Sequence, residues 1–178
     1  VINNIRKSRE DYIPFDDNVF DICVSNQVFE HVSEISIMCS ELNRILKPGA
    51  EMFLSFPVKE IFIEPHLKLP LIHRISYSKR ITSFYLNFAY CFKFGAVKNT
   101  HLSRSEWVEN RLEYLKNSVN YLTEKSFIAI LEKNNFVVSN ISRQHYIERF
   151  GMGILTKLIL YLVPIKRVSS IAIYAKVI

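Results

Sequence analysis

Residues 19–56, VFDICVSNQVFEHVSEISIMCSELNRILKPGAEMFLSF, decide the fold of this chain. The run from Val19 to Ser25 is almost continuously apolar and rich in β-branched residues, which is typical of a strand buried on both faces of a parallel sheet. Apolar residues then recur at helical spacing from Ile35 to Leu46, and residues 51–56 predict a second strand. A strand, an amphipathic helix and a strand in this order predict a βαβ unit and a doubly wound sheet.

Local patterns predict where the other elements begin and end. Ser33 and Thr123 are expected to be helix N-caps, whereas Lys47-Pro48-Gly49 and Asn134-Asn135 are expected to end helices. The remaining predicted elements are helical turns with apolar spacing from Val108 to Leu122, a helix over 124–133, a strand over 136–141 and a last strand over 171–178. We interpret the chain as a single domain, residues 1–178, in which these elements complete the sheet.

The middle of the chain is different in character. The stretch after Pro57 has no clean period, contains Pro65 and Pro70, and is rich in aromatic residues. We therefore expect residues 57–121 to form a helical, aromatic insertion, and such insertions often form lids or substrate walls.

The composition is that of an ordinary globular protein. Of its 178 residues, 49% are hydrophobic and 22% are charged, and the net charge is +6. This charge favours contact with phosphates, nucleic acid or an anionic membrane, but the basic residues are scattered and no nucleic-acid module accompanies them. A nucleic-acid partner is therefore not favoured.

Cysteine usage and hydropathy indicate a cytoplasmic protein. The three cysteines show no CxxC spacing, so neither a zinc site nor a disulfide framework is indicated. The apolar stretch Ile154 to Ile165 is too short for a membrane span and is interrupted by Lys157 and Pro164. An interfacial helix, and so peripheral contact with a membrane, remains the alternative to burial against the sheet.

Two stretches resemble class I S-adenosylmethionine-dependent methyltransferases of the type 11 kind. The first runs from Ile13-Pro14-Phe15-Asp16-Asp17-Asn18-Val19-Phe20-Asp21 through Glu30-His31-Val32 to Arg44-Ile45-Leu46-Lys47-Pro48-Gly49. The second runs from Leu122-Thr123-Glu124 to Asn135-Phe136-Val137-Val138. The resemblance implies an α/β, Rossmann-like, doubly wound and mostly parallel sheet, to which this chain contributes strands 4 to 7 together with the helical insertion.

The chain also departs from the family pattern. The glycine-rich turn that approaches the cofactor and the acid that binds its ribose are both absent, and Gly151-Met152-Gly153 lies too late in the chain to replace the turn. Ala50 stands where the family has the second glycine of KPGG. We therefore expect an amino-terminally truncated, carboxy-terminal part of a methyltransferase, in which residues 1–5 are a remnant of the third strand.

The resemblance implies S-adenosylmethionine as cofactor and methyl transfer to a small-molecule, lipid or glycan acceptor. Glu10 and Asp11 lie near the family's adenine-binding acid, although a solvated loop charge is the alternative. Asn26 and Gln27 directly follow the first strand, at the sheet edge where ligands of open α/β folds bind, with helix capping as the alternative. These four residues are the predicted cofactor contacts.

Three residues are candidates for the chemistry. His31, in the stretch that resembles the family's EHV, can act as a base or an orienting group, or simply hold its turn. Glu64 and His66 open the insertion near the family's acceptor site and can deprotonate an acceptor, unless they belong to an ordinary polar loop. No metal is expected, because the other three histidines are spaced irregularly.

Two further expectations concern the whole chain. The alternative to an enzyme is a degenerate, non-enzymatic binding module, or a membrane-surface module that docks through its basic tail, residues 157–176, and the apolar residues 154–163. Without strands one and two, the strand over residues 19–25 would also have an unpaired apolar edge, so we expect poor solubility or self-association.

Overall fold

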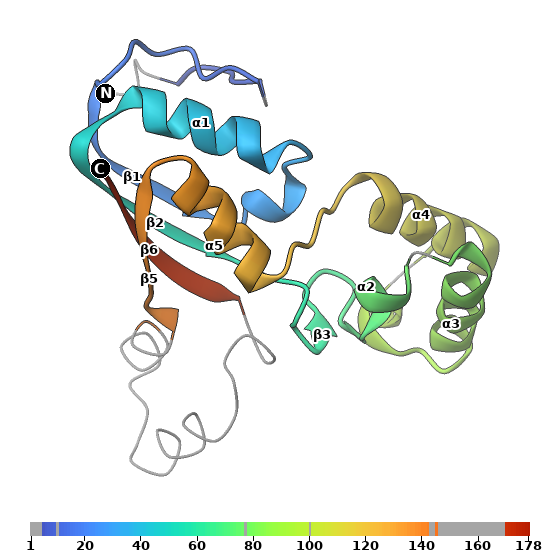
Figure 1. Ribbon diagram of the computed structural model, residues 1–178. Coiled ribbons are helices and arrows are strands. Elements are labelled where there is room, and N and C mark those ends of the chain that lie inside the picture. Colours follow the sequence, from blue (N-terminus) through green and yellow to red (C-terminus); the bar gives the residue numbers. More distant parts are fainter. Residues whose placement is uncertain (1–4, 10, 77, 100, 143–144, 146–169) are drawn as a thin grey trace.

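The computed structural model describes residues 5–9, 11–76, 78–99, 101–142, 145 and 170–178. Its main sheet has four strands in the order β1-β2-β6-β5 (Figure 1). The strands are β1 (Phe20–Asn26), β2 (Leu46–Phe56), β5 (Phe136–Asn140) and β6 (Ile171–Val177). β1 and β2 are parallel, and β6 is antiparallel to both β2 and β5, so three of the four strands point the same way. The expected α/β, Rossmann-like and mostly parallel sheet is confirmed.

Two helices cover one face of this sheet. α1 (Ile35–Ile45) connects β1 to β2, and α5 (Glu124–Lys133) precedes β5; both lie on the same side (Figure 1). The Phe127 ring of α5 packs edge-on against the Phe29 ring. Its centroid lies 4.4 Å from that of the Phe56 ring. The buried side of the sheet therefore holds both helices through aromatic and aliphatic contacts.

The apolar run of β1 predicts burial on both faces of the sheet, and this prediction is wrong. Ile22 is exposed and Val24 is 73% exposed. The reason is its position: β1 is an edge strand, and α1 and α5 cover only one face of the sheet. Phe53 and Val137 are also exposed, and the strand register places them on the same uncovered face as Ile22 and Val24.

The predicted helix ends are partly right. Thr123 is the N-cap of α5, because its hydroxyl accepts a hydrogen bond from the Ser126 amide, and Asn135 adopts the expected left-handed conformation. Ser33 is not an N-cap: Glu34 precedes α1, and no side chain caps the helix. Lys47-Pro48-Gly49 already lies within β2, where the register with β1 is irregular.

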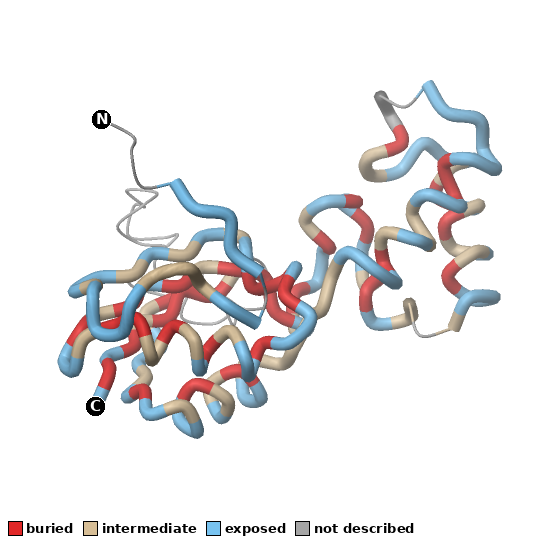
Figure 2. The backbone as a smooth tube through the Cα atoms, turned by 90° about the horizontal axis from the view of Figure 1, so that it is seen from above, coloured by how far each residue is buried: buried red, intermediate tan, exposed pale blue. Residues whose placement is uncertain are grey.

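The insertion contains a second group of buried residues. Its elements are β3 (Ile63–Glu64), β4 (Leu69–Pro70), α2 (Ile72–Ile75), α3 (Lys79–Cys91), η2 (Gly95–Asn99) and α4 (Arg104–Asn117). Figure 2 shows the buried residues of this part as a group apart from those of the sheet, and Trp107 lies among them. α4 ends at Asn117, so the predicted helical spacing fails beyond that residue. The division into a domain and an insertion over 57–121 remains a prediction.

Several expectations fall outside the described residues. These are Glu10, residues 1–4 of the expected strand remnant, the Gly151-Met152-Gly153 stretch and the apolar residues 154–163. Among the helices that the structure describes, none has the length and hydropathy that crossing a membrane requires.

Candidate functional site

The carboxyl end of β1 presents the first polar residues of the candidate site. Asn26 ends the strand and is exposed, and Gln27 follows it with a left-handed backbone, φ 55°. The Gln27 amide nitrogen Nε2 donates to Ser170 Oγ at 3.0 Å, and its backbone N–H donates to the Ser55 carbonyl at 2.7 Å. A left-handed conformation is strained for a residue other than glycine, and such strain often occurs at functional sites. Gln27 is therefore held in place, whereas Asn26 faces solvent.

The next turn, η1 (Phe29–His31), buries a carboxylate. Glu30 is 1% exposed, and neither of its carboxylate oxygens has a hydrogen-bond partner among the described residues. Burial raises the pKa of Glu30 above its ordinary value. A buried carboxyl group without a partner is costly, which makes this residue the most unusual of the site.

Asn120 fixes this turn from the chain segment that follows α4. Its backbone N–H donates to the Glu30 carbonyl at 2.6 Å, and its side-chain amide donates to the carbonyls of Val32 and Ser33. His31 Nδ1 lies 2.6 Å from the Ser118 carbonyl oxygen. These contacts dock the end of the insertion onto the carboxyl end of β1.

The insertion contributes a second carboxylate, which is fully satisfied. Glu64 is 0% exposed; its Oε1 lies 3.0 Å from His66 Nδ1 and accepts from the Tyr121 hydroxyl at 2.6 Å. Its Oε2 accepts from the Leu67 N–H. Burial, and then the charge of Glu64, raise the pKa of Tyr121 well above its ordinary value. Glu64 thus fixes the orientation of the His66 ring.

The two parts meet at the histidines. The ring centroids of His31 and His66 are 5.5 Å apart, and Glu30, His31 and His66 each offer one nitrogen or oxygen ligand atom within 4.8 Å of the others. We call these three residues the Glu–His cluster. The Tyr114 ring lies 5.7 Å from that of His66, and its buried hydroxyl has no hydrogen-bond partner among the described residues.

The structure thus brings together the three residues predicted to be catalytic, His31, Glu64 and His66, although β2 separates them in the sequence. Their roles remain predictions. Sequence reasoning missed Glu30, Tyr114 and Tyr121. Glu30 was visible as the acid beside His31, but a sequence pattern does not report that a carboxylate is buried without a partner.

Asp11 lies elsewhere. It forms an ion pair with Arg9 at 3.1 Å, and both side chains are exposed. The neighbouring Tyr12 lies under the guanidinium of Arg44, near the carboxyl end of α1, whereas Asn26 lies near the amino end of that helix. The structure therefore does not bring Asp11 and Asn26 together, and the cofactor role of Asp11 remains a prediction.

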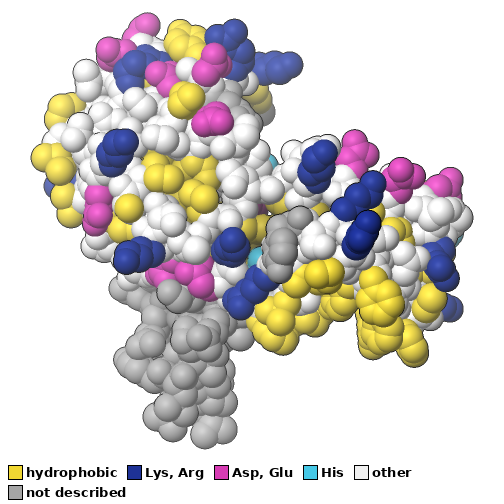
Figure 3. Space-filling model, turned by 45° about the vertical axis from the view of Figure 1, so that its right-hand side comes forward, with side chains coloured by type: hydrophobic (Ala, Val, Ile, Leu, Met, Phe, Trp, Pro, Cys, Tyr) yellow, Lys and Arg dark blue, Asp and Glu magenta, His cyan; other side chains and the backbone are white. Residues whose placement is uncertain are grey.

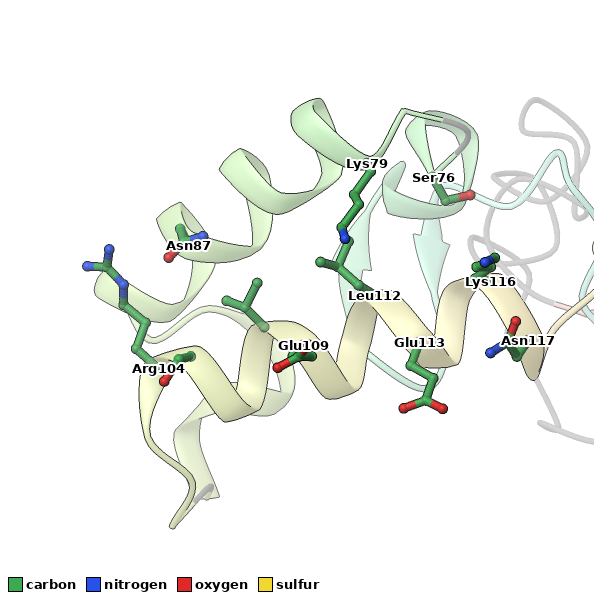
Figure 4. Close-up of a pocket in the computed structure, with 11 residues that line it drawn as sticks. Ser76, Lys79, Asn87, Arg104, Glu109, Leu112, Glu113, Lys116 and Asn117 are labelled. Carbon is green, nitrogen blue, oxygen red and sulfur yellow. The ribbon is translucent and has the colours of Figure 1, made fainter.

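Described residues of the insertion line a larger and a smaller cavity. The larger, of about 930 Å³, lies between α3 and α4, where Lys79 of α3 extends toward Leu112 of α4 (Figure 4). It shares no residue with the Glu–His cluster. The smaller, of about 310 Å³, is lined by Asn120 and Tyr121, which contact the cluster and Glu64. We regard the smaller cavity as the one that belongs to the site, because its walls touch the site's own residues.

The residues at the carboxyl end of β1 fit one side of a nucleotide-type cofactor site. Asn26 ends β1 and places a polar side chain at the sheet edge where open α/β folds bind ligands. The two glycines that the structure describes lie elsewhere: Gly49 is in the first half of β2 and Gly95 is in the insertion. The described residues therefore contain no glycine-rich turn that would complete the cradle.

Comparisons with known proteins agree with this geometry. Residues 2–54 match the family model described as a methyltransferase domain. An uncharacterized protein of Escherichia coli, YafE, is 32% identical over 65 residues, which are 33% of this chain and 31% of that protein. The chain therefore spans about a third of the length of the curated relative that it matches.

The fold itself has a solved counterpart. An S-adenosylmethionine-dependent methyltransferase from Mesorhizobium loti superposes with a TM-score of 0.52 at 12% sequence identity, over 96% of this chain and 68% of that one. S-adenosylmethionine is the cofactor of this class of proteins. Residues 2–54 thus match the sequence of a methyltransferase domain, and the sheet has the fold of a solved class I S-adenosylmethionine-dependent methyltransferase.

Proposed function

We propose that this chain takes part in methyl transfer from S-adenosylmethionine to a small-molecule, lipid or glycan acceptor. One observation carries the proposal. The parallel β1–α1–β2 unit, whose sequence matches a methyltransferase domain, ends at a group of ionisable side chains, the Glu–His cluster and Glu64, in which both carboxylates are buried. Such groups at the carboxyl ends of parallel strands are typical of binding and catalytic sites.

The chemistry asks little of the protein beyond positioning. The cofactor supplies an electrophilic methyl group, and the protein must hold the acceptor atom in line with it and exclude water. Asn26 and Gln27 would contact the cofactor. His31 and His66 would bind the acceptor and accept its proton, and Glu64, hydrogen-bonded to His66 Nδ1, would stabilise the imidazolium that results.

The alternative proposal is a degenerate module that keeps the fold and binds without catalysis. Cofactor binding separates the two. The protein expressed from its complete reading frame should release heat when titrated with S-adenosylhomocysteine in a calorimeter. Asn26→Ala should weaken binding about tenfold, or roughly 1.4 kcal/mol, because it removes a contact at the sheet edge.

The matched control is Asn117→Ala, an exposed asparagine at the end of α4 in the larger cavity, which should bind as the unchanged protein does. No heat with the unchanged protein would refute the enzyme and leave the binding module. Equal affinity of Asn26→Ala and the unchanged protein would remove Asn26 from the site.

A specific observation favours a lipid among the acceptors. α3 and the turn after it expose an apolar surface, which we call the aromatic face (Figure 3). Its members are Ile81, Phe84, Phe88, Phe92 and Phe94, and Phe84 is 76% exposed. Arg80 and Lys93 are exposed beside it. An aromatic surface flanked by cations is typical of proteins that bind an anionic membrane surface.

Co-sedimentation with vesicles tests this lipid proposal. The protein should sediment with vesicles rich in phosphatidylglycerol at low salt, and Phe84→Asp together with Phe92→Asp should abolish sedimentation. Phe62→Asp, an exposed phenylalanine of the insertion outside the aromatic face, is the control. If the double variant sediments as the unchanged protein does, the aromatic face does not bind membranes.

A further inference from the structure

We propose that the Glu–His cluster binds a divalent transition-metal ion, with Zn²⁺ as the probe of choice. The ligands would be one carboxylate oxygen of Glu30 and the Nε2 atoms of His31 and His66. Two imidazoles and one carboxylate are an established ligand set for zinc, and this set leaves one coordination position open.

Within the part of the chain that the structure describes, the carboxylate of Glu30 lacks the partner that its burial requires. It is buried, and neither oxygen has a hydrogen-bond partner among the described residues, yet His31 Nε2 lies only 4.0 Å from Oε1. A bound cation would compensate the burial of this charge. The buried carboxylate of Glu30 is therefore an independent sign of a cation site, and the histidines beside it are the groups that would share the ion.

Both imidazoles are held in the orientation that metal ligation needs. His31 Nδ1 faces the Ser118 carbonyl at 2.6 Å; because a carbonyl only accepts, Nδ1 carries the proton and Nε2 keeps its lone pair. His66 Nδ1 faces Glu64 at 3.0 Å in the same manner. Ligating histidines usually donate their other N–H to a carbonyl or carboxylate, which raises the basicity of the ligating nitrogen.

The side chains are also close enough to share an ion: one ring nitrogen of each histidine and one carboxylate oxygen of Glu30 lie within 4.8 Å of one another. A tetrahedral zinc ion at about 2.1 Å from each ligand would hold them about 3.4 Å apart, so the side chains need to close by up to about 1.4 Å. The buried Tyr114 hydroxyl beside His66 could then hydrogen-bond to whatever fills the open position.

The ion has a role if the proposed function is right. With one coordination position open, the ion would bind an acceptor oxygen and lower the pKa of its hydroxyl. His31 and His66 would then act on the acceptor through the ion rather than directly. This role rests on the proposed function, whereas binding of the ion does not.

Zinc titration without cofactor tests the site on its own. Protein freed of metal by dialysis against EDTA should bind one Zn²⁺ per chain in a calorimeter. With Co²⁺ in place of Zn²⁺, it should show the visible absorption bands of a Co²⁺ ion in a low-symmetry site. His31→Ala and His66→Ala should each weaken zinc binding at least tenfold, and Glu30→Gln should do the same because it removes the anionic ligand. Glu64→Gln, a positioning variant, should weaken binding about 10- to 100-fold and alter the cobalt spectrum.

His101→Ala, at an exposed histidine outside the cluster, is the matched control and should bind zinc unchanged. If Glu30→Gln fails to fold, the two histidine variants still decide, since both side chains are partly exposed. No saturable zinc binding, or unchanged binding by His66→Ala, would overturn the proposal. Zinc binding without S-adenosylhomocysteine binding would retain the metal site and reject the methyltransferase.

Discussion

Arg44 shows how single residues organise the amino-terminal segment. Its guanidinium donates to the carbonyls of Ile13 and Phe15, to Asp17 at 2.7 Å and to Glu41 at 2.8 Å. The Glu41 carboxylate also accepts from the Ile13 N–H. The side chains of Arg44 and Glu41, both on α1, thus anchor the Ile13-Pro14-Phe15 stretch by hydrogen bonds to its backbone. The sequence pattern located this stretch but did not indicate what anchors it.

Glu41 should make stability depend on pH. The hydrogen bond from Arg44 holds the pKa of Glu41 below its usual range. Because the folded-state pKa is the lower one, the stabilisation is complete above the ordinary pKa of glutamate and is lost as the pH falls through the lowered value. Glu41→Gln should cost about 1 kcal/mol at neutral pH and less in acid.

Urea unfolding at a series of pH values measures this effect. The control is Glu132→Gln, an exposed glutamate on α5, which should follow the unchanged protein. A constant difference between Glu41→Gln and the unchanged protein at every pH would show that Glu41 does not titrate in this way.

At the scale of elements, the turn that carries His66 depends on a glycine of η2. Gly95 has φ +61°. A Cβ added there would lie less than 3.0 Å from the carbonyl oxygens of Leu67 and Lys68, which is closer than a Cβ atom can approach them without a clash. Ala96 also donates to the Leu67 carbonyl at 2.9 Å. η2 therefore sets the position of the segment that contains Glu64 and His66.

Gly95→Ala should accordingly damage both stability and the site. Gly49→Ala is the control, since Gly49 also has a positive φ, +82°, but a Cβ there would only make an ordinary van der Waals contact with the Lys176 side chain at 3.9 Å. Each substitution costs about 1–2 kcal/mol for the left-handed backbone, and only Gly95→Ala adds a steric clash. Urea unfolding should show the larger loss for Gly95→Ala, with weaker zinc binding; equal losses for the two variants would contradict this account.

The elements also show which parts of the fold a sequence reveals. The parallel unit, the Thr123 cap and the Asn135 turn follow from local chemistry, and all three were predicted. The exposed face of β1 was not, because an apolar strand has the same pattern whether or not a helix covers it. The Glu–His cluster was missed as a unit because Glu30 and His66 meet only through the docking of the insertion, which no local pattern encodes.

At the scale of the whole molecule, the sheet has one apolar face that none of the described helices covers, and this face ends in an edge strand. Ile22 and Val24 on β1 are both exposed, and the outer edge of β1 pairs with no described strand. Apolar edges of this kind promote pairing between chains. We therefore expect this 178-residue chain to self-associate.

Val24→Lys should reduce this self-association, because a charge on an edge strand opposes strand pairing. Sedimentation velocity should show a shift toward monomer. Ile37→Lys, at an exposed apolar residue of α1, should leave association unchanged. A monomeric unchanged protein, or equal effects of both variants, would exclude the β1 edge as the cause.

The central claim is that the carboxyl end of β1 is a cofactor-binding edge. Backbone amide chemical shifts recorded with and without S-adenosylhomocysteine test it most directly. We expect the largest changes on residues 26–31, at that end of β1 and in η1, and little change over residues 16–19, at the opposite end. Changes confined to residues 16–19, or no changes at saturating ligand, would contradict it.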